Sequence, residues 1–265
     1  MSFRTNTRPK LSAQVFYWED KILWIGRVVE AKLVNRYATT LFLSLDDDPI
    51  TIGLENGQKI SGRGVLVGPR SQRHQTIVNR DVIAMIWEQQ GFEAQALLHE
   101  LVRKPIQTVV PENISRIKEL VAQLNHGRNK RHIGAEISGE LSACVASLFC
   151  DQIRLDTRIL RAANILRAEV PSHLDGECLA KQLDISLERL RHLFSEQMGV
   201  SLINYLLWSK LRRTFLYINT GCSATEVALE CGFSDLSHMT RTFRNLVGIT
   251  PTIVLEGNNI EAIHC

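Results

Sequence analysis

The sequence predicts an α+β protein of two domains, in which an antiparallel β-barrel or sandwich precedes an all-helical part with two helix-turn-helix motifs. Short β-branched and aromatic runs fill the first hundred residues, with Asp, Asn and Gly between several of them. Past Pro105 the apolar residues recur at steps of three and four, as on one face of a helix. Two helix-turn-helix patterns follow, at residues 174–198 and 222–246. We therefore expect a β domain over residues 1–105, a helical segment over 106–154 and a helical domain over 155–265.

The composition, with 45% hydrophobic and 22% charged residues, describes a soluble globular protein. The longest apolar runs are far shorter than a membrane span, and the first ten residues lack the apolar core of a secretion signal. We therefore expect a cytoplasmic protein with no membrane partner. The six cysteines form no CxxC or Cys/His cluster, which favours reduced, buried thiols and no bound metal or cofactor. The net charge of only +3 gives weak support for nucleic-acid binding, so the placement of the charges matters more than their sum.

The β region offers two clear turns and a set of aromatic residues. Residues 46–49 (Asp-Asp-Asp-Pro) and 55–57 (Glu-Asn-Gly) are predicted turns, because Pro ends strand pairing and Asn-Gly tolerates positive φ. Aromatic side chains at strand spacing either line a small-molecule pocket or fill the core; they are Trp18, Trp24, Tyr37, Phe42 and Trp87. Between two strands, Arg70, Arg73 and His74 either bind an anionic effector or belong to a solvated loop.

The helical segment begins with one apolar stripe, formed by Ile114, Ile117, Val121 and Leu124. This first helix either mediates dimerisation or covers an open end of the sheet. A basic turn follows at residues 127–131, and two further helices are predicted, near 135–151 and from about 156 to 169.

The second helix of the first helix-turn-helix motif has a clear start and end. Ser186 suits the N-cap, because its hydroxyl can accept a backbone N–H of the first turn, and Gly199 can adopt the left-handed conformation that ends a helix. Three apolar residues, Leu190, Leu193 and Phe194, then face inward. The outer face is left to Glu188, Arg189, Arg191 and His192.

The second motif follows the same logic. Ser223 and Glu226 form an S-x-x-E capping box, and Gly232 makes the turn. In the helix that follows, four apolar residues face the core: Leu236, Met239, Phe243 and Leu246. The exposed set is Ser237, His238, Arg241 and Arg244.

A connecting helix over residues 202–220 is predicted between the motifs. It would span about 27 Å at 1.5 Å per residue, against about 34 Å between successive major-groove faces. It could therefore hold two reading helices one turn of duplex apart. Its apolar stripe is Leu202, Tyr205, Leu206, Leu211, Phe215 and Ile218, and its local positive charge comes from Lys210, Arg212 and Arg213.

Several runs in this region occur together and in register. They include Leu-Ala-x-x-Leu-x-Ile-Ser (179–186), Val-Ala-x-x-Cys-Gly-Phe-Ser-Asp-x-Ser-His (227–238) and Gly-Ile-Thr-Pro (248–251). Over about the last hundred residues the chain resembles the AraC/XylS family of transcription regulators. It departs from the family at Thr214, where a small alanine is usual, and at His238-Met239, where an aromatic residue often follows the serine.

The resemblance implies a sequence-specific regulator, more commonly an activator, that binds double-stranded promoter DNA and works with RNA polymerase. Carried onto this chain, the base-reading positions are Glu188, Arg191 and His192 in the first motif, and Ser237, His238 and Arg241 in the second. The arginines either read guanine edges or hold phosphates or surface carboxylates, and Glu188 either accepts from cytosine or favours its helix N-terminus. His192 and His238 either read bases or are solvated or bound to phosphate.

The resemblance further implies a cupin-like N-terminal domain that senses a small-molecule effector or forms a homodimer. The turn at residues 68–74 is similar to a worn cupin turn, but there is no His-x-His, so the sequence indicates no catalytic residue and no metal site. The alternative is a non-catalytic cupin-like ligand-binding protein, or a cupin enzyme, whose C-terminal helices are structural.

Overall fold

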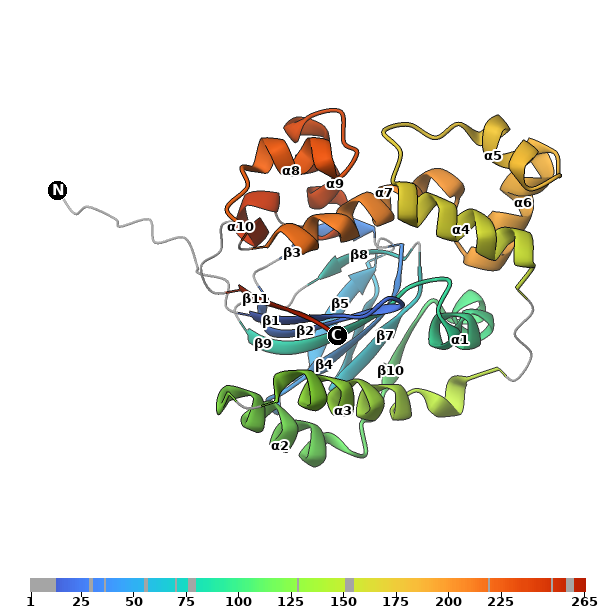
Figure 1. Cartoon of the computed structure of the whole chain (residues 1–265). Helices are drawn as coiled ribbons and strands as arrows, with labels where there is room; N and C mark the ends of the chain where they lie inside the picture. Colours follow the sequence, from blue (N-terminus) through green and yellow to red (C-terminus); the bar gives the residue numbers. More distant parts are fainter. Residues whose placement is uncertain are drawn as a thin grey trace.

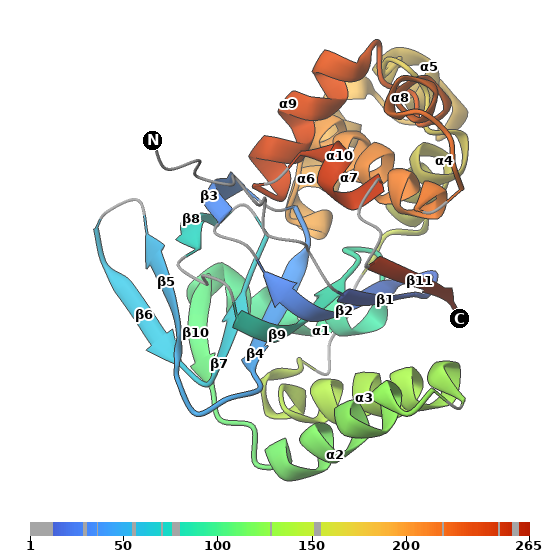
Figure 2. The same ribbon diagram turned by 90° about the vertical axis from the view of Figure 1, so that its left-hand side faces the viewer.

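The computed structural model confirms the predicted class, with a sheet-rich part followed by a helical part (Figure 1). It describes residues 13–28, 31–35, 37–54, 57–69, 71–75, 80–127, 129–150, 155–218, 220–248, 250–255 and 260–265; residues 27, 28, 31–35, 72–75, 80 and 253 are described by their backbone alone. The main sheet lies between two helical layers, with α2 (Ile114–Asn125) and α3 (Lys130–Ala143) on one face and the C-terminal helices on the other (Figures 1 and 2).

The described strands form two sheets, and every pairing among them but one is antiparallel. The larger sheet has the order β10 (Ile106–Val109), β7 (Gly64–Val67), β4 (Thr39–Ser44), β9 (Arg80–Trp87), β2 (Lys21–Val28), β1 (Ala13–Tyr17) and β11 (Ile260–His264). The smaller has the order β3 (Ala31–Asn35), β8 (Gln72–Gln75), β5 (Ile50–Leu54) and β6 (Lys59–Gly62). The exceptional pair is β1 with β11, which run parallel although they come from opposite ends of the sequence.

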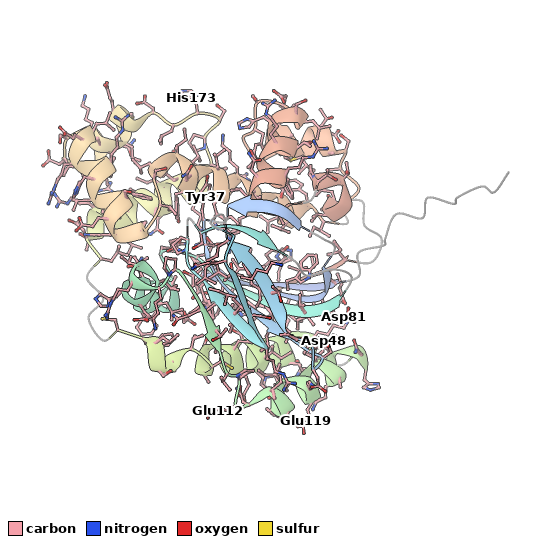
Figure 3. All side chains as sticks on the ribbon, turned by 180° about the vertical axis from the view of Figure 1, so that it is seen from behind. Tyr37, Asp48, Asp81, Glu112, Glu119 and His173 are labelled. Atoms are coloured by element: carbon pink, nitrogen blue, oxygen red, sulfur yellow. The ribbon has the colours of Figure 1, made fainter. Side chains whose placement is uncertain are left out.

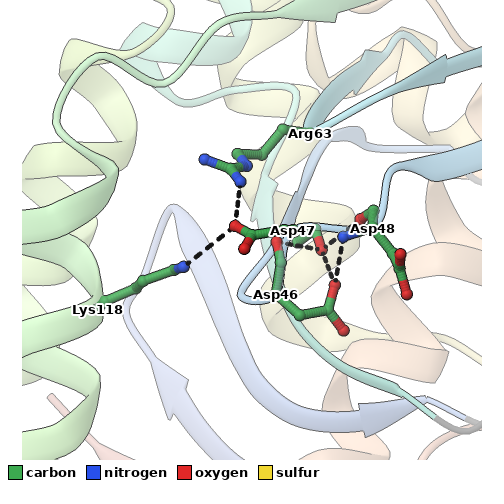
Figure 4. Close-up of polar contacts among 6 residues, drawn as sticks. Asp46, Asp47, Asp48, Arg63 and Lys118 are labelled. Carbon is green, nitrogen blue, oxygen red and sulfur yellow. Dashed lines mark hydrogen bonds and ion pairs between the residues drawn. The ribbon is translucent and has the colours of Figure 1, made fainter.

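The predicted turn at 46–49 joins β4 to β5 and also contacts α2 (Ile114–Asn125). The carboxylate of Asp46 accepts from the hydroxyl of Ser44 at 2.7 Å and from the backbone N–H of Asp48 at 3.2 Å. The neighbouring Asp47 pairs with Arg63 and lies 3.8 Å from the ammonium of Lys118 on α2 (Figure 4). Of the second predicted turn, residues 55 and 56 lie outside the described residues.

The helices α2 (Ile114–Asn125) and α3 (Lys130–Ala143) pack against one face of the larger sheet. Ile117 and Leu124 are fully or almost fully buried in the same apolar cluster as Phe16. Gly134 permits the close approach of α3, since a Cβ there would collide with the ring of Phe16. The apolar stripe of α2 therefore packs on the sheet, which was one of the two alternatives for this helix. The homodimer stays a prediction.

Three other elements in or beside this region differ from the prediction made from the sequence. The helix expected at 135–151 instead runs over α3 and is followed by a short 3-10 turn, η1 (Ala146–Leu148). Helix α1 (Phe92–Arg103) was not predicted, and strand β10 lies where a helical segment was expected.

Seven α-helices of the described residues follow Asp156. They are α4 (Thr157–Glu169), α5 (Gly176–Gln182), α6 (Leu187–Met198), α7 (Leu202–Thr214), α8 (Ala224–Glu230), α9 (Leu236–Leu246) and α10 (Pro251–Leu255). The connecting helix is shorter than predicted, because it ends at Thr214 and continues only as a 3-10 turn, η2 (Phe215–Tyr217). Its 13 residues span about 20 Å rather than about 27 Å.

The sheet and the C-terminal helices share one apolar core. Val15 and Ile22 of the sheet belong to the same buried cluster as Leu211 and Trp208 of α7. The rings of Tyr17 and Phe215 lie 5.7 Å apart across this junction. Such continuous packing holds α7 on the sheet. The division of the chain at residues 105 and 154 stays a prediction.

Candidate nucleic-acid interface

The first helix-turn-helix motif is built from α5 and α6. Asp184, at φ 54°, makes the turn, and the hydroxyl of Ser186 accepts from the backbone N–H of Arg189 at 3.2 Å, as the predicted N-cap. Gly199, at φ 66°, ends α6 in the left-handed conformation, also as predicted. Leu190 and Phe194 are fully buried. The inner face of α6 is thus fixed by packing, and its outer face is left free of the core.

The predicted outer residues of α6 are all exposed: Glu188, Arg189, Arg191 and His192. Nδ1 of His192 lies 3.6 Å from the carboxylate of Glu196, one turn along the helix. Within the described part of the chain, no hydrogen bond or ion pair engages the side chain of Arg191. This guanidinium is therefore available to a partner.

The second motif is built from α8 and α9. Ser223 and Glu226 form the predicted capping box, with distances of 3.3 Å and 2.8 Å. Gly232 makes the turn at φ 77°. The N-cap of α9 is Asp235, which the sequence analysis did not predict. Its carboxylate accepts from the backbone N–H of His238 at 2.7 Å. The Ser-Asp pair before the helix is the sequence signal that identifies such a cap.

On α9 the four predicted residues differ in exposure. Ser237, Arg241 and Arg244 are exposed, whereas His238 is half-buried. The His238 ring meets the ring of Phe233 edge-on, with 5.4 Å between centroids, and its Nδ1 lies 3.2 Å from the hydroxyl of Ser234. Partial burial, and then the positive charges of Lys210 and Arg241, hold the pKa of His238 below its ordinary value. In the free protein this imidazole is therefore mostly uncharged at neutral pH.

Two of the three cations expected to supply positive charge on α7 point into the protein. Lys210 is 2% exposed and donates to the carbonyl of Ser172 at 2.6 Å. Arg212 forms a 2.9 Å ion pair with the buried carboxylate of Glu88. Lys210 and Arg212 were expected to supply local positive charge, but each side chain has a partner inside the protein and is not free to contact DNA.

The candidate pocket residues of the β region lie in different surroundings. Trp87 is fully buried in the apolar core, and Trp24 packs against the apolar cluster between the two sheets. Tyr37 lies at the junction of the sheet and the helical layer (Figure 3) and packs against apolar clusters of both. Arg70 lies outside the described residues, as do the side chains of Arg73 and His74, whose backbone forms part of β8.

The six cysteines differ in exposure, and none is paired. The six thiols are free, but Cys178, Cys222 and Cys265 are exposed, so the expectation of buried thiols is wrong for these three. Burial raises the pKa of Cys231 to about 12. Among the described residues, no group of three or more His, Cys, Asp or Glu side chains could hold a metal ion. No described helix is long and apolar enough to cross a membrane.

Comparison with known proteins bears on the same segment. Residues 179–256, from α5 to the end of α10, match the model of a helix-turn-helix domain family. The HTH-type transcriptional activator RhaS of Escherichia coli O139:H28 (strain E24377A / ETEC) is 25% identical over 154 residues, which is 55% of each chain. RhaS of Escherichia coli (strain K12 / DH10B) matches to the same extent. The chain thus spans about half the length of the curated relatives it matches.

Solved structures resemble nearly the whole chain in fold. An apo variant of ToxT from Vibrio cholerae strain SCE256 aligns with a TM-score of 0.63 and 11% identity, over 90% of this chain and 98% of its own. Wild-type ToxT of that strain, bound to an unsaturated fatty acid, aligns with a TM-score of 0.56 and 13% identity, over 94% and 95%. The matched helix-turn-helix segment, the similarity to RhaS and the shared two-part fold support the resemblance to the AraC/XylS family.

Proposed function

We propose that this protein is a sequence-specific DNA-binding transcription regulator that inserts α6 and α9 into successive major grooves of promoter DNA. The observation that carries the proposal is the pair of capped helices, each with a buried apolar face and an exposed polar face, inside the matched segment. Helices with this build are the ones that enter a major groove in helix-turn-helix proteins.

The arrangement of the two helices supports simultaneous contact with one duplex. The first motif lies at one end of α7 and the second motif at the other (Figure 1). Although α7 alone spans only about 20 Å, the reading helices lie beyond its ends, so their separation can approach the roughly 34 Å between groove faces. A modest bend of the DNA would close any remaining difference.

Within each helix we assign roles by side-chain chemistry. Arg191 and Arg241 read bases, because an exposed guanidinium can donate two hydrogen bonds to guanine. Glu188 and Ser237 are further base-facing positions. Arg189, Arg244 and His192 contact the phosphate backbone, and His238 chiefly braces the start of α9.

We also propose that the protein activates transcription through contact with RNA polymerase and acts as a cytoplasmic homodimer; the activating role is supported by the relatives named as a transcriptional activator. A small-molecule effector controls it, in keeping with ToxT structures that hold a fatty acid or an arylbutenoic acid. We propose no catalytic activity.

A binding-site selection with the full chain tests the proposal. We expect a defined recognition sequence, bound more tightly than unrelated DNA. Arg191→Ala and Arg241→Ala should each weaken this binding by about 1–3 kcal/mol. The matched control is Arg116→Ala, which removes an exposed arginine on α2, on the opposite face of the sheet. Failure to select any sequence, or equal losses in all three variants, would contradict the proposal.

A further inference from the structure

The last described strand, β11, fixes the chain on the sheet again after the second motif. It lies at the edge of the larger sheet, between the C-terminal helices and α3 (Figure 2). It pairs with β1, from Ala13 beside Ile260 to Tyr17 beside His264. The backbone N–H of Cys265 extends the pairing, since it donates to the carbonyl of Tyr17 at 2.9 Å. The segment that follows the second motif is therefore attached to the start of the β region.

The two faces of β11 contact different parts of the protein, because successive side chains of a strand point to opposite sides. Ile260 is 1% exposed and belongs to the apolar cluster that holds the buried residues of α8, α9 and α10, and Ala262 packs against the same cluster. On the other face, Ile263 packs against the cluster that includes the buried residues of α2 and α3. The strand is thus a direct link between the second motif and the sheet with its opposite helical layer.

The carboxylate of Glu261 holds β11 on the α3 side. It lies 2.6 Å from the ammonium of Lys130 at the start of α3, and it accepts from the side-chain amide of Gln14 on β1 at 3.3 Å. Solvent and salt weaken this ion pair, because the side chains of Glu261 and Lys130 are 48% and 26% exposed. Among the described strands β11 has one neighbour, and a parallel one. The strand can therefore leave the sheet without unfolding of the core.

The second motif is held on the sheet at both of its ends. Before it, the ion pair of Arg212 with Glu88 fixes α7; after it, β11 follows α10. The first motif has its own contact with the β region, because the side-chain amide of Gln95 on α1 donates to the carbonyl of Gln197 on α6 at 3.1 Å. Two motifs fixed on one body lose less freedom when both bind a duplex, which favours simultaneous contact.

We propose that β11 positions the second motif for simultaneous contact with DNA, and that Glu261 is the positioning residue that keeps this strand on β1 and α3. Its effect passes through Ile260 and α10, since its own partners are Gln14 and Lys130. Release of β11 lets α8 and α9 move relative to the first motif. It therefore lowers the affinity for a complete site and spares the affinity for the half that α9 reads. This consequence rests on the proposed function.

Charge reversal in the full chain tests the strand contact without DNA. In Glu261→Lys a second cation faces Lys130, and hydrogen exchange followed by mass spectrometry should show residues 260–265 exchanging at least about threefold faster. The double variant Lys130→Glu with Glu261→Lys restores opposite charges and should return the exchange rate to that of the parent. The matched control is Glu136→Lys, which reverses a carboxylate of α3 that pairs with Arg116 of α2 and should leave the exchange of β11 unchanged.

Removal of the strand tests its effect on DNA binding. A chain that ends at Leu255 is titrated with two duplexes: the complete selected site, and the same site with the first half scrambled. We expect at least about tenfold weaker binding of the complete site, because the two contacts are no longer made by one rigid body. Binding of the second half alone should stay within about twofold of the parent, which also shows that the second motif remains folded.

Two results would overturn the role of Glu261: unchanged exchange in Glu261→Lys, or no recovery in the double variant. Unchanged affinity of the shortened chain for the complete site would overturn the positioning role of β11. Equal losses on both duplexes would do the same, since the strand would then serve the fold of the motif and not its placement. If the parent chain binds neither duplex, the proposed function fails and the exchange result still stands.

Discussion

Arg212 of α7 and Glu88 at the end of β9 form a buried ion pair, with 2.9 Å between Nε and Oε1, that joins the helical part to the sheet. The other carboxylate oxygen of Glu88 accepts from the indole N–H of Trp208 at 2.9 Å. One carboxylate therefore engages two side chains of α7, one turn apart. Because α7 connects the two motifs, this contact fixes both motifs relative to the sheet.

Replacing Arg212 with Ala should destabilise the protein strongly. The change leaves the carboxylate of Glu88, which is 2% exposed, without its counter-charge, and a broken buried pair costs about 3–5 kcal/mol. Urea unfolding measures the loss. The matched control is Arg213→Ala, whose side chain has no partner in the described structure and should change stability by no more than about 0.5 kcal/mol.

The double variant Glu88→Gln with Arg212→Met removes both charges of the ion pair and so tests whether the loss comes from an unpaired charge. If an unpaired charge causes the loss, this variant should be more stable than Arg212→Ala alone. Equal losses in Arg212→Ala and Arg213→Ala would show that the pair does not hold α7 on the sheet.

Gly232→Ala should also be strongly destabilising, because the turn of the second motif requires glycine. The backbone there has φ 77°, and a Cβ would collide with the carbonyl oxygen of Val170 at the end of α4. We expect a loss of at least about 2 kcal/mol in thermal or urea unfolding.

Gly139→Ala on α3 is the control for this substitution. A Cβ at Gly139 meets nothing within 4 Å, so the alanine should stabilise the helix by about 0.5–1 kcal/mol. A Gly232→Ala variant as stable as the parent would mean that α4 and the turn do not pack as described.

The pH dependence of stability should contain a contribution from His238. Its folded pKa lies below the ordinary value of 6.5, so the unfolded state takes up the proton first as the pH falls. The contribution of His238 to the free energy of unfolding is therefore fully present above pH 6.5. It is lost as the pH falls through 6.5 toward the pKa of the folded state. His238→Gln should remove this slope in urea unfolding followed from about pH 8 to about pH 5. A constant difference between parent and variant over that range would contradict the assignment.

The two motifs were predictable because their signals are local. A cap residue and the N–H it accepts from lie three positions apart, as for Ser186 and for Ser223 with Glu226. The turn glycines and the buried faces of α6 and α9 likewise follow from a few adjacent positions. The exposure of Arg191 and Arg241 followed from the same periodicity, whereas their contacts with DNA stay a prediction.

The features that sequence reasoning missed depend on distant partners. Strand β11 forms only because β1, near the other end of the chain, accepts it as a parallel neighbour. From the sequence, Lys210 and Arg212 were expected to be surface cations, because their partners Ser172 and Glu88 are distant along the chain. The early end of α7 has a similar cause, since Phe215 of the 3-10 turn packs against Tyr17 of the sheet. Long-range packing of this kind overrides local helical periodicity.

The central claim is that α6 and α9 read one duplex in successive major grooves, and methylation interference on a selected site tests it most directly. We predict two sets of major-groove guanine contacts whose centres lie about 10–10.5 base pairs apart. Arg191→Ala should lose contacts only in the first set, and Arg241→Ala only in the second. A single set of contacts, or the same lost positions in both variants, would contradict the account.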